Sequence, residues 1–115
     1  MAREFVYTKI FDKRWFEMGL SDDELRKLES YLLDNPNAGD TIQGAGGATK
    51  LRWGLPGTSK RDGMRVIYID LIRAEHIHMV TCYPKSKKDT LTDGEKSTIK
   101  ETIKRVIKDE RQGSQ

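Results

Sequence analysis

The chain has 115 residues and a mass of 13.2 kDa; 36% of the residues are hydrophobic, 34% are charged, and the mean hydropathy is −0.71. These values fit one core of moderate size, so we expect residues 1–115 to form a single domain. No apolar run approaches the roughly 20 residues that cross a bilayer, and MAREFVYTKI lacks the pattern of a signal peptide, so we expect a cytoplasmic protein without membrane contact. The single cysteine, Cys82, excludes an internal disulfide and a cysteine-rich metal site.

The net charge of +3 is distributed unevenly along the chain. Residues 1–40 carry a net charge of −3, residues 41–92 carry +5, and residues 93–115 carry +1. The middle segment is therefore where a surface that binds anions is expected.

The N-terminal third predicts a strand followed by two helices. Residues 4–7, Glu-Phe-Val-Tyr, are typical of a strand, and Thr8 is a candidate cap for a helix that runs from Lys9 towards Gly19. Residues 21–24, Ser-Asp-Asp-Glu, form a capping-box sequence that begins a second helix, which Asn35-Pro36 ends. Because the connection between them is short, we expect the two helices to form a hairpin.

The middle segment changes from a helical to an alternating pattern after the flexible turn 44–47. Strands are predicted at residues 50–53, 64–70 and 76–83, and the first two are joined by the basic loop 54–63. Consecutive strands with such short connections pair, so we expect a small, mainly antiparallel twisted sheet.

The C-terminal segment predicts a last helix. Pro84 ends the third of these strands, residues 85–88 form a basic loop, and residues 92–95, Thr-Asp-Gly-Glu, form a second capping box. An apolar stripe then continues to Ile107, and residues 111–115 are expected to be a frayed tail. The predicted order is β-α-α-β-β-β-α, an α+β domain in which the hairpin and the last helix pack on the sheet.

Three cations of the middle segment are predicted to share one face of this sheet. Lys50 and Arg52 alternate with apolar neighbours, and Arg65 lies on the next strand. We expect no acid on the adjoining strands to neutralise them. The trio is either a solvated strand face or a surface that binds phosphate.

Motifs of other catalytic classes are largely absent, since the sequence has no P-loop, dinucleotide fingerprint, nucleophile elbow or His-Glu-x-x-His. His76 and His78 share a strand face, but no third ligand is indicated nearby, so we interpret them as half-buried strand residues without metal. Cys82 is interpreted as a small buried hydrophobe. Tyr83 borders the basic loop, and the sequence allows two roles for it: packing in the core, or presenting its hydroxyl group at the site.

Three segments together resemble the RelE superfamily of bacterial toxins, with the HigB-type branch as the nearest likeness. They are IQGAGGATKLR at 42–52, GMRVIY at 63–68 and YPKSKKDTLT at 83–92. The similarity as a whole runs in order from about Phe5 to Ile107. The resemblance implies the toxin of a type II toxin–antitoxin pair, an endoribonuclease without cofactor or metal that cleaves mRNA in the A site of the 70S ribosome. It also implies that a helix-turn-helix antitoxin of the HigA type silences the toxin. The toxin would then contact operator DNA only indirectly, through this antitoxin.

The resemblance assigns roles to individual cations. Cleavage by a ribose 2′-hydroxyl needs a base, stabilisation of the phosphorane charge and an acid. Arg65 matches the family's transition-state arginine and, with Arg52, is assigned to the phosphate. Lys50 and Lys85 match family lysines and are the candidate bases, because like charges nearby disfavour the charged form of an amine.

Two positions depart from the best-known members. Ser86 stands where some have an arginine, and Thr92 stands where some have a C-terminal tyrosine. Tyr83 or Lys85 is then expected to take over proton transfer, or positioning by the ribosome replaces it. The expected contacts with ribosomal RNA are made by Lys60, Arg61, Lys87 and Lys88.

Two alternatives share this fold. One is a ParE-like inhibitor that binds DNA gyrase without catalysis, and the other is an inactive relative that serves as an RNA-binding module or co-repressor.

Overall fold

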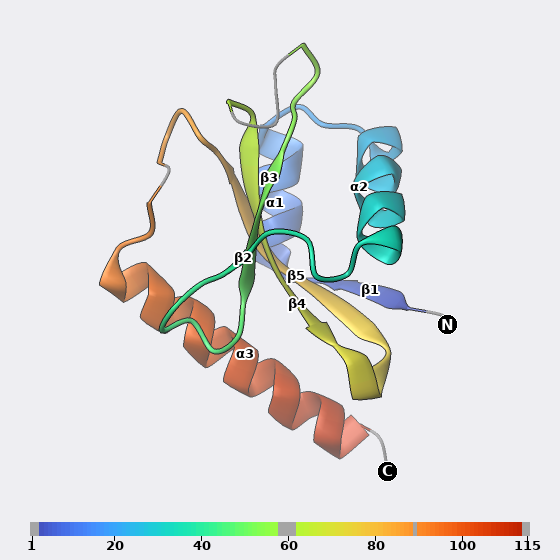
Figure 1. Ribbon diagram of the computed structural model, residues 1–115, viewed down its shortest axis with the longest axis vertical. Coiled ribbons are helices and arrows are strands. Elements are labelled where there is room, and N and C mark those ends of the chain that lie inside the picture. Colours follow the sequence, from blue (N-terminus) through green and yellow to red (C-terminus); the bar gives the residue numbers. More distant parts are fainter. Residues whose placement is uncertain (1–2, 58–61, 89, 114–115) are drawn as a thin grey trace.

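In the part of the chain that the structure describes, five strands form one mixed sheet, and three helices pack on it (Figure 1). The computed structural model describes residues 3–57, 62–88 and 90–113. The elements in chain order are β1 (Glu4–Tyr7), α1 (Lys9–Glu17), α2 (Asp22–Asp34), β2 (Asp40–Thr41), β3 (Thr49–Trp53), β4 (Met64–Leu71), a 3-10 turn (Ile72–Ala74), β5 (His76–Pro84) and α3 (Asp93–Gly113). The predicted α+β class is confirmed.

The sheet has the strand order β1-β5-β4-β3-β2. β1 runs parallel to β5, and the other neighbours are antiparallel. The predicted element order lacked β2, a strand of two residues that is too short to show alternation. The predicted frayed tail was also wrong in part: α3 continues through Gly113, while residues 114–115 lie outside the described ones.

The placement of β2 depends on tertiary contacts. The Tyr68 hydroxyl donates a hydrogen bond to the carbonyl oxygen of Ala38, at 2.6 Å. Gly39 follows with φ +98°, and a Cβ at this position would lie 2.3 Å from the carbonyl oxygen of Lys50. Only glycine therefore lets the chain approach β3 closely enough to add this edge strand.

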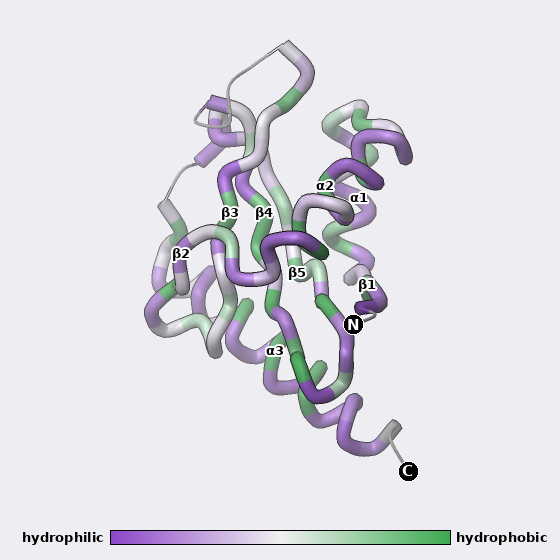
Figure 2. The backbone as a smooth tube through the Cα atoms, turned by 45° about the vertical axis from the view of Figure 1, so that its right-hand side comes forward, coloured by the Kyte–Doolittle hydropathy of each residue, from purple (hydrophilic) through white to green (hydrophobic). Residues whose placement is uncertain are grey.

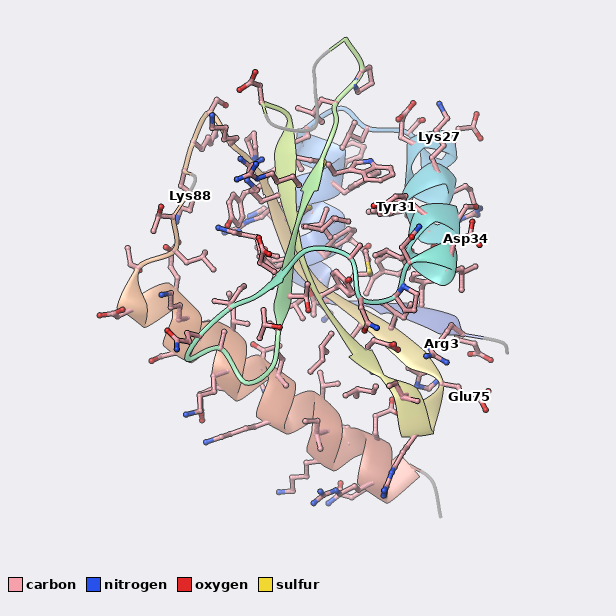
Figure 3. The ribbon with its side chains drawn as sticks, viewed as in Figure 1. Arg3, Lys27, Tyr31, Asp34, Glu75 and Lys88 are labelled. Carbon is pink, nitrogen blue, oxygen red and sulfur yellow. The ribbon has the colours of Figure 1, made fainter. Side chains whose placement is uncertain are left out.

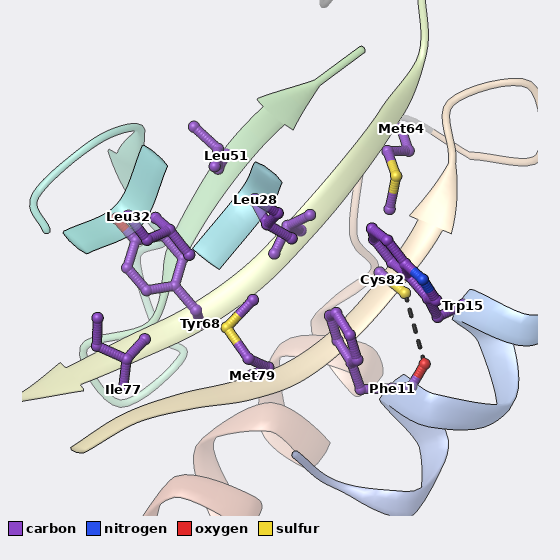
Figure 4. Packing of buried hydrophobic residues seen from close by; sticks show 11 residues of the cluster. Phe11, Trp15, Leu28, Leu32, Leu51, Met64, Tyr68, Ile77, Met79 and Cys82 are labelled. Atoms are coloured by element: carbon purple, nitrogen blue, oxygen red, sulfur yellow. Dashed lines mark hydrogen bonds between the residues drawn. The ribbon is translucent and has the colours of Figure 1, made fainter. Parts of the chain in front are cut away.

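Each face of the sheet carries its own hydrophobic core. The first core lies under α1 and α2 and comprises Phe11, Trp15, Leu28, Leu32, Leu51, Met64, Val66, Tyr68, Ile77, Met79 and Cys82 (Figure 4). The second core lies under α3 and comprises Ala45, Ala48, Ile67, Ile69, Val80, Tyr83, Leu91, Ile99 and Ile103. The alternation predicted for β4 is confirmed, since Met64, Val66 and Tyr68 enter the first core whereas Ile67 and Ile69 enter the second.

The turn 44–47 was expected to be flexible, but Ala45 and its neighbour Ala48 are buried in the second core.

Along α3, hydrophobic and hydrophilic stretches alternate, as expected of a helix with one buried face (Figure 2). Among the described residues, no helix combines the length and apolar character needed to cross a membrane.

The three predicted helix caps are present. The side chains of Thr8 and Ser21 accept hydrogen bonds from the backbone N–H groups of Phe11 and Glu24, at 3.1 and 3.2 Å. Thr92 and Glu95 form a reciprocal capping box at the start of α3, with distances of 2.9 and 3.2 Å. Local sequence signals therefore set where each helix begins.

A β-bulge interrupts β5 at Val80. Ile67 pairs with Thr81 whereas Tyr68 pairs with Met79, so Val80 has no partner on β4. The carbonyl oxygen of Val80 instead accepts a hydrogen bond from the Thr8 hydroxyl group, at 2.6 Å. The extra residue reverses the alternation along β5, because a one-residue shift moves every later side chain to the other face.

Thr8 therefore both caps α1 and satisfies the bulge, so Thr8→Ala is expected to lower the free energy of unfolding by about 1–2 kcal/mol. Thr8→Ser keeps the hydroxyl group and is expected to lose much less. Thr98→Ala removes the hydroxyl of an exposed threonine that bonds within α3 and serves as the control. Urea denaturation measures all three, and a Thr8→Ala variant as stable as Thr98→Ala would contradict this role.

Candidate functional site

Three of the predicted site residues form one row across the sheet. Arg52 on β3 pairs with Arg65 on β4, and Arg65 pairs with Tyr83 on β5. Directly paired residues lie on the same face, with neighbouring strands about 4.8 Å apart. The Arg52–Arg65–Tyr83 row therefore brings two guanidinium groups and a phenol together on the face that carries the second core.

The row depends on the bulge at Val80. Uninterrupted alternation would place Tyr83 on the same face as Ile77 and Met79, in the first core. Because of the extra residue, Tyr83 lies instead beside Arg65.

The environment of Arg65 differs from a solvated strand face. Its side chain is 1% exposed, and its Nη1 donates a hydrogen bond to the carbonyl oxygen of Met64 at 3.2 Å. Burial of a cation is costly, and a guanidinium in such a place attracts anions more strongly than one in bulk water. Arg52, its partner on β3, is exposed, so the row extends from the interior to the solvent.

The base of the β3–β4 hairpin sets this register. Gly63 packs against β3, where an added Cβ would lie 2.3 Å from the carbonyl oxygen of Trp53. On its other side, the carbonyl oxygen of Gly63 accepts a hydrogen bond from the backbone N–H of Lys85, at 3.0 Å. Lys85 is thereby held at the end of the sheet that contains the row, with its Nζ 3.4 Å from an oxygen of Asp62.

Lys50 has an acidic neighbour that was not expected. Asp40 on β2 lies directly across from Lys50, and β2 was not predicted. The expectation that no acid lies on an adjoining strand was therefore wrong at this position. Lys50 shares the face of the row but lies two residue pairs further along the strands, level with Ile67.

The residues predicted to contact ribosomal RNA differ in their surroundings. Lys60 and Arg61 lie outside the described residues. Lys87 is exposed, whereas Lys88 (labelled in Figure 3) forms an ion pair with Glu95 at the start of α3. Of the two departures from the family pattern, Ser86 is exposed, and Thr92 is the cap of α3.

Tyr83 packs in the second core and is 5% exposed. It also forms part of the wall of a pocket of about 530 Å³ between α1, β5 and the first half of α3. Arg14 and Arg105 line the same pocket. No residue of the Lys50, Arg52, Arg65 and Lys85 set lines it, so the pocket adjoins the row only through Tyr83.

Sequence reasoning missed a third group beside the two histidines. Glu110, near the end of α3, places a carboxylate oxygen 2.9 Å from Nδ1 of His76 and 3.4 Å from Nε2 of His78. The expectation that no third ligand lies nearby was therefore wrong. Burial lowers the pKa of His78, although the charge of Glu110 acts in the opposite direction. The apolar stripe of α3 extended one turn past Ile107 could have placed Glu110 on this face.

No protein-family model matches the chain. The fold is similar to that in the crystal structure of the isolated E. coli RelE toxin, with a TM-score of 0.52 over 91% of this chain and 99% of that one. The sequence identity is 16%, so the likeness concerns the fold. The expected RelE-like fold is confirmed, and the HigB-type branch stays a prediction.

Cys82 has the environment predicted for it. It is fully buried, its Sγ lies 3.7 Å from the carbonyl oxygen of Phe11, and burial raises the pKa of the thiol to about 12 (Figure 4). We expect the folded protein to react with an aromatic disulfide reagent at pH 8 far more slowly than the urea-unfolded chain, whose thiol has a pKa of about 8.5. Absorbance of the released thiolate measures the rate, and equal rates in both states would contradict the burial.

Proposed function

We propose that the chain is the toxin of a type II toxin–antitoxin pair and acts as a ribosome-dependent, metal-independent mRNA endoribonuclease. The observation that carries the proposal is the Arg52–Arg65–Tyr83 row on the sheet of a RelE-like fold. Residues 1–115 form its one catalytic domain, and it acts in the cytoplasm, where its substrate is translated. The nearest branch is the HigB type.

The reaction needs little beyond positioning and charge. The 2′-oxygen of a ribose attacks the adjacent phosphorus, a base accepts the hydroxyl proton, and the P–O5′ bond breaks as an acid protonates the leaving oxygen. The products are a 2′,3′-cyclic phosphate and a free 5′-hydroxyl group. The phosphorane formed on the way carries additional negative charge, which donors already in place stabilise.

The geometry separates the roles of the two arginines. Arg65 is buried and held by its neighbours, so its guanidinium needs no reorganisation when charge develops, and we assign it to the phosphorane. Arg52 is exposed beside it and is suited to grip an incoming phosphate with paired N–H groups. Tyr83, packed under α3, lies against Arg65 from the β5 side and is assigned to its positioning.

Proton transfer is assigned to Lys50 or Lys85. Lys50 is half-buried on β3 and faces Asp40, whereas Lys85 is anchored through Gly63 and lies 3.4 Å from Asp62. The two amines lie on different sides of the row, where one can serve as base and the other as acid. A chain without a histidine at this end of the sheet depends on the ribosome to align the 2′-hydroxyl.

The partners follow from the same proposal. They are the 70S ribosome with mRNA in its A site and a helix-turn-helix antitoxin of the HigA type, which provides the contact with operator DNA. Lys87 and Lys88, together with Lys60 and Arg61, contribute to binding of ribosomal RNA, and this binding is expected to weaken as salt rises.

The first test removes the arginines without leaving a cavity. Arg65→Met keeps the length of a buried side chain, and Arg52→Ala changes an exposed one. Each is expected to slow mRNA cleavage on translating ribosomes by roughly 10²–10³-fold, the usual cost of one donor to a developing oxyanion. Arg73→Ala, an exposed arginine in the 3-10 turn, is the matched control. Primer extension measures cleavage, and circular dichroism checks the fold.

The outcomes separate the alternatives. Undiminished cleavage by Arg65→Met would overturn the assigned role. Growth arrest with DNA-damage signalling and intact mRNA would identify a gyrase inhibitor, and expression without growth arrest would identify an inactive relative.

A second test distinguishes the two lysines. The two variants are Lys50→Gln and Lys85→Gln. The variant that lacks the base is expected to have a single-turnover cleavage rate reduced by about 10²–10⁴-fold. Loss of a lysine that only binds phosphate is expected to weaken ribosome binding and to leave the rate at saturation nearly unchanged. Lys27→Gln, on the opposite side of the molecule on α2, is the control (Figure 3). If both variants keep the saturated rate of the native chain, neither lysine transfers the proton.

A further inference from the structure

The end of β5 opposite the row carries a compact group of metal-ligating side chains. His76 and His78 lie at alternate positions of β5, and Glu110 reaches them from the last turns of α3. One nitrogen of each histidine and one oxygen of Glu110 all lie within 4.8 Å of one another. Ligand atoms about 2.0–2.2 Å from a tetrahedral metal lie roughly 3.3 Å apart, close to the 2.9 and 3.4 Å that separate Glu110 from the two nitrogens.

The second observation is a buried nitrogen aimed into this group. His78 is 5% exposed, and its buried Nε2 forms no hydrogen bond of good geometry among the described residues, although an oxygen of Glu110 lies 3.4 Å away. A buried polar atom left in this way costs free energy unless something else binds it. A neutral imidazole presents a lone pair that a metal ion can use.

We propose that His76, His78 and Glu110 bind one transition-metal ion of the Zn²⁺ class. Two imidazole nitrogens and one carboxylate oxygen are a donor set that zinc uses, whereas Mg²⁺ and Ca²⁺ prefer oxygen ligands. Three protein ligands leave a fourth tetrahedral position for water.

Glu4 supports this arrangement from the β1 side. It pairs with His76 in the parallel β1–β5 ladder, and its carboxylate lies 3.9 Å from Nε2 of that histidine. If Nδ1 of His76 binds the ion, its Nε2 is free to donate to Glu4 after a small movement of this exposed side chain. Histidines that bind metals commonly donate their other N–H to a carboxylate, which fixes the ring.

The ion would act as a clamp between the sheet and the last turns of α3. His76 and Tyr83 are seven residues apart on β5, which at about 3.3 Å per residue corresponds to roughly 20 Å. The site is therefore remote from the Arg52–Arg65–Tyr83 row and does not depend on the proposed nuclease activity.

The experiment uses the full chain without a histidine tag. His76 and His78 are the two histidines of the chain, and Cys82 is buried in the first core, so imidazole-bound metal reports on this site. Zn²⁺ is titrated calorimetrically, and Co²⁺ is followed by its visible absorption. We expect one ion per chain, the absorption of tetrahedral Co²⁺, and a higher Tm with Zn²⁺ than with Mg²⁺.

The variants His76→Gln, His78→Gln and Glu110→Gln are each expected to weaken Zn²⁺ binding by about tenfold or more. Glu101→Gln, an exposed glutamate on the same helix, is the matched control and is expected to bind as the native chain does. If the buried His78 variant fails to fold, the other two, which change half-buried side chains, carry the test.

Two results would overturn the proposal. One is the absence of saturable binding at roughly 100 µM Zn²⁺, far above what a structural site requires. The other is native affinity in either half-buried variant, which would make the group a hydrogen-bonded contact only. Cleavage assays in a chelator that removes Zn²⁺ but spares ribosomal Mg²⁺ test the nuclease proposal separately, because that activity is expected to persist.

Discussion

The extra residue at Val80 is the constraint on which the arrangement of β5 depends. Both faces of β5 are covered, and its buried apolar side chains divide between the two cores: Ile77, Met79 and Cys82 lie in the first, and Val80 and Tyr83 lie in the second. Before the bulge, His76 and His78 face α3; after it, Tyr83 does so as well, and Cys82 enters the opposite core. Thr8 donates a hydrogen bond to the carbonyl oxygen of the bulged Val80, so the start of α1 and the register of the central strands are one connected feature.

Features that depend on a few neighbouring residues could be predicted from the sequence. The caps at Thr8, Ser21 and Thr92 and the alternation along β4 follow from hydrogen bonds and periodicity within one element. The bulge and β2 could not be predicted in this way. Each arises where chain segments distant in sequence meet, as Tyr68 does with the segment that precedes β2.

In the candidate site, too, the residue types could be predicted from the sequence, whereas their surroundings depend on contacts between distant segments. The residue types that pointed to phosphate chemistry, such as Arg52 and Arg65, were visible in the sequence, but their surroundings were not. Arg65 is buried, and Asp40 faces Lys50, because of residues contributed by other strands. A cation held inside the protein is preorganised in a way that a solvated one is not, so the burial of Arg65 supports the proposal that it stabilises developing charge.

The last helix links the two ends of β5. At its start, Glu95 caps the helix and pairs with Lys88; near its end, Glu110 lies against the histidines. Between these two points Ile99 and Ile103 pack in the second core together with Tyr83. An ion bound near the end of α3 would therefore affect the row only through the position of the helix. Because packed cores resist gradual deformation, the effect expected of such a clamp is on the stability of the fold rather than on the chemistry of the row.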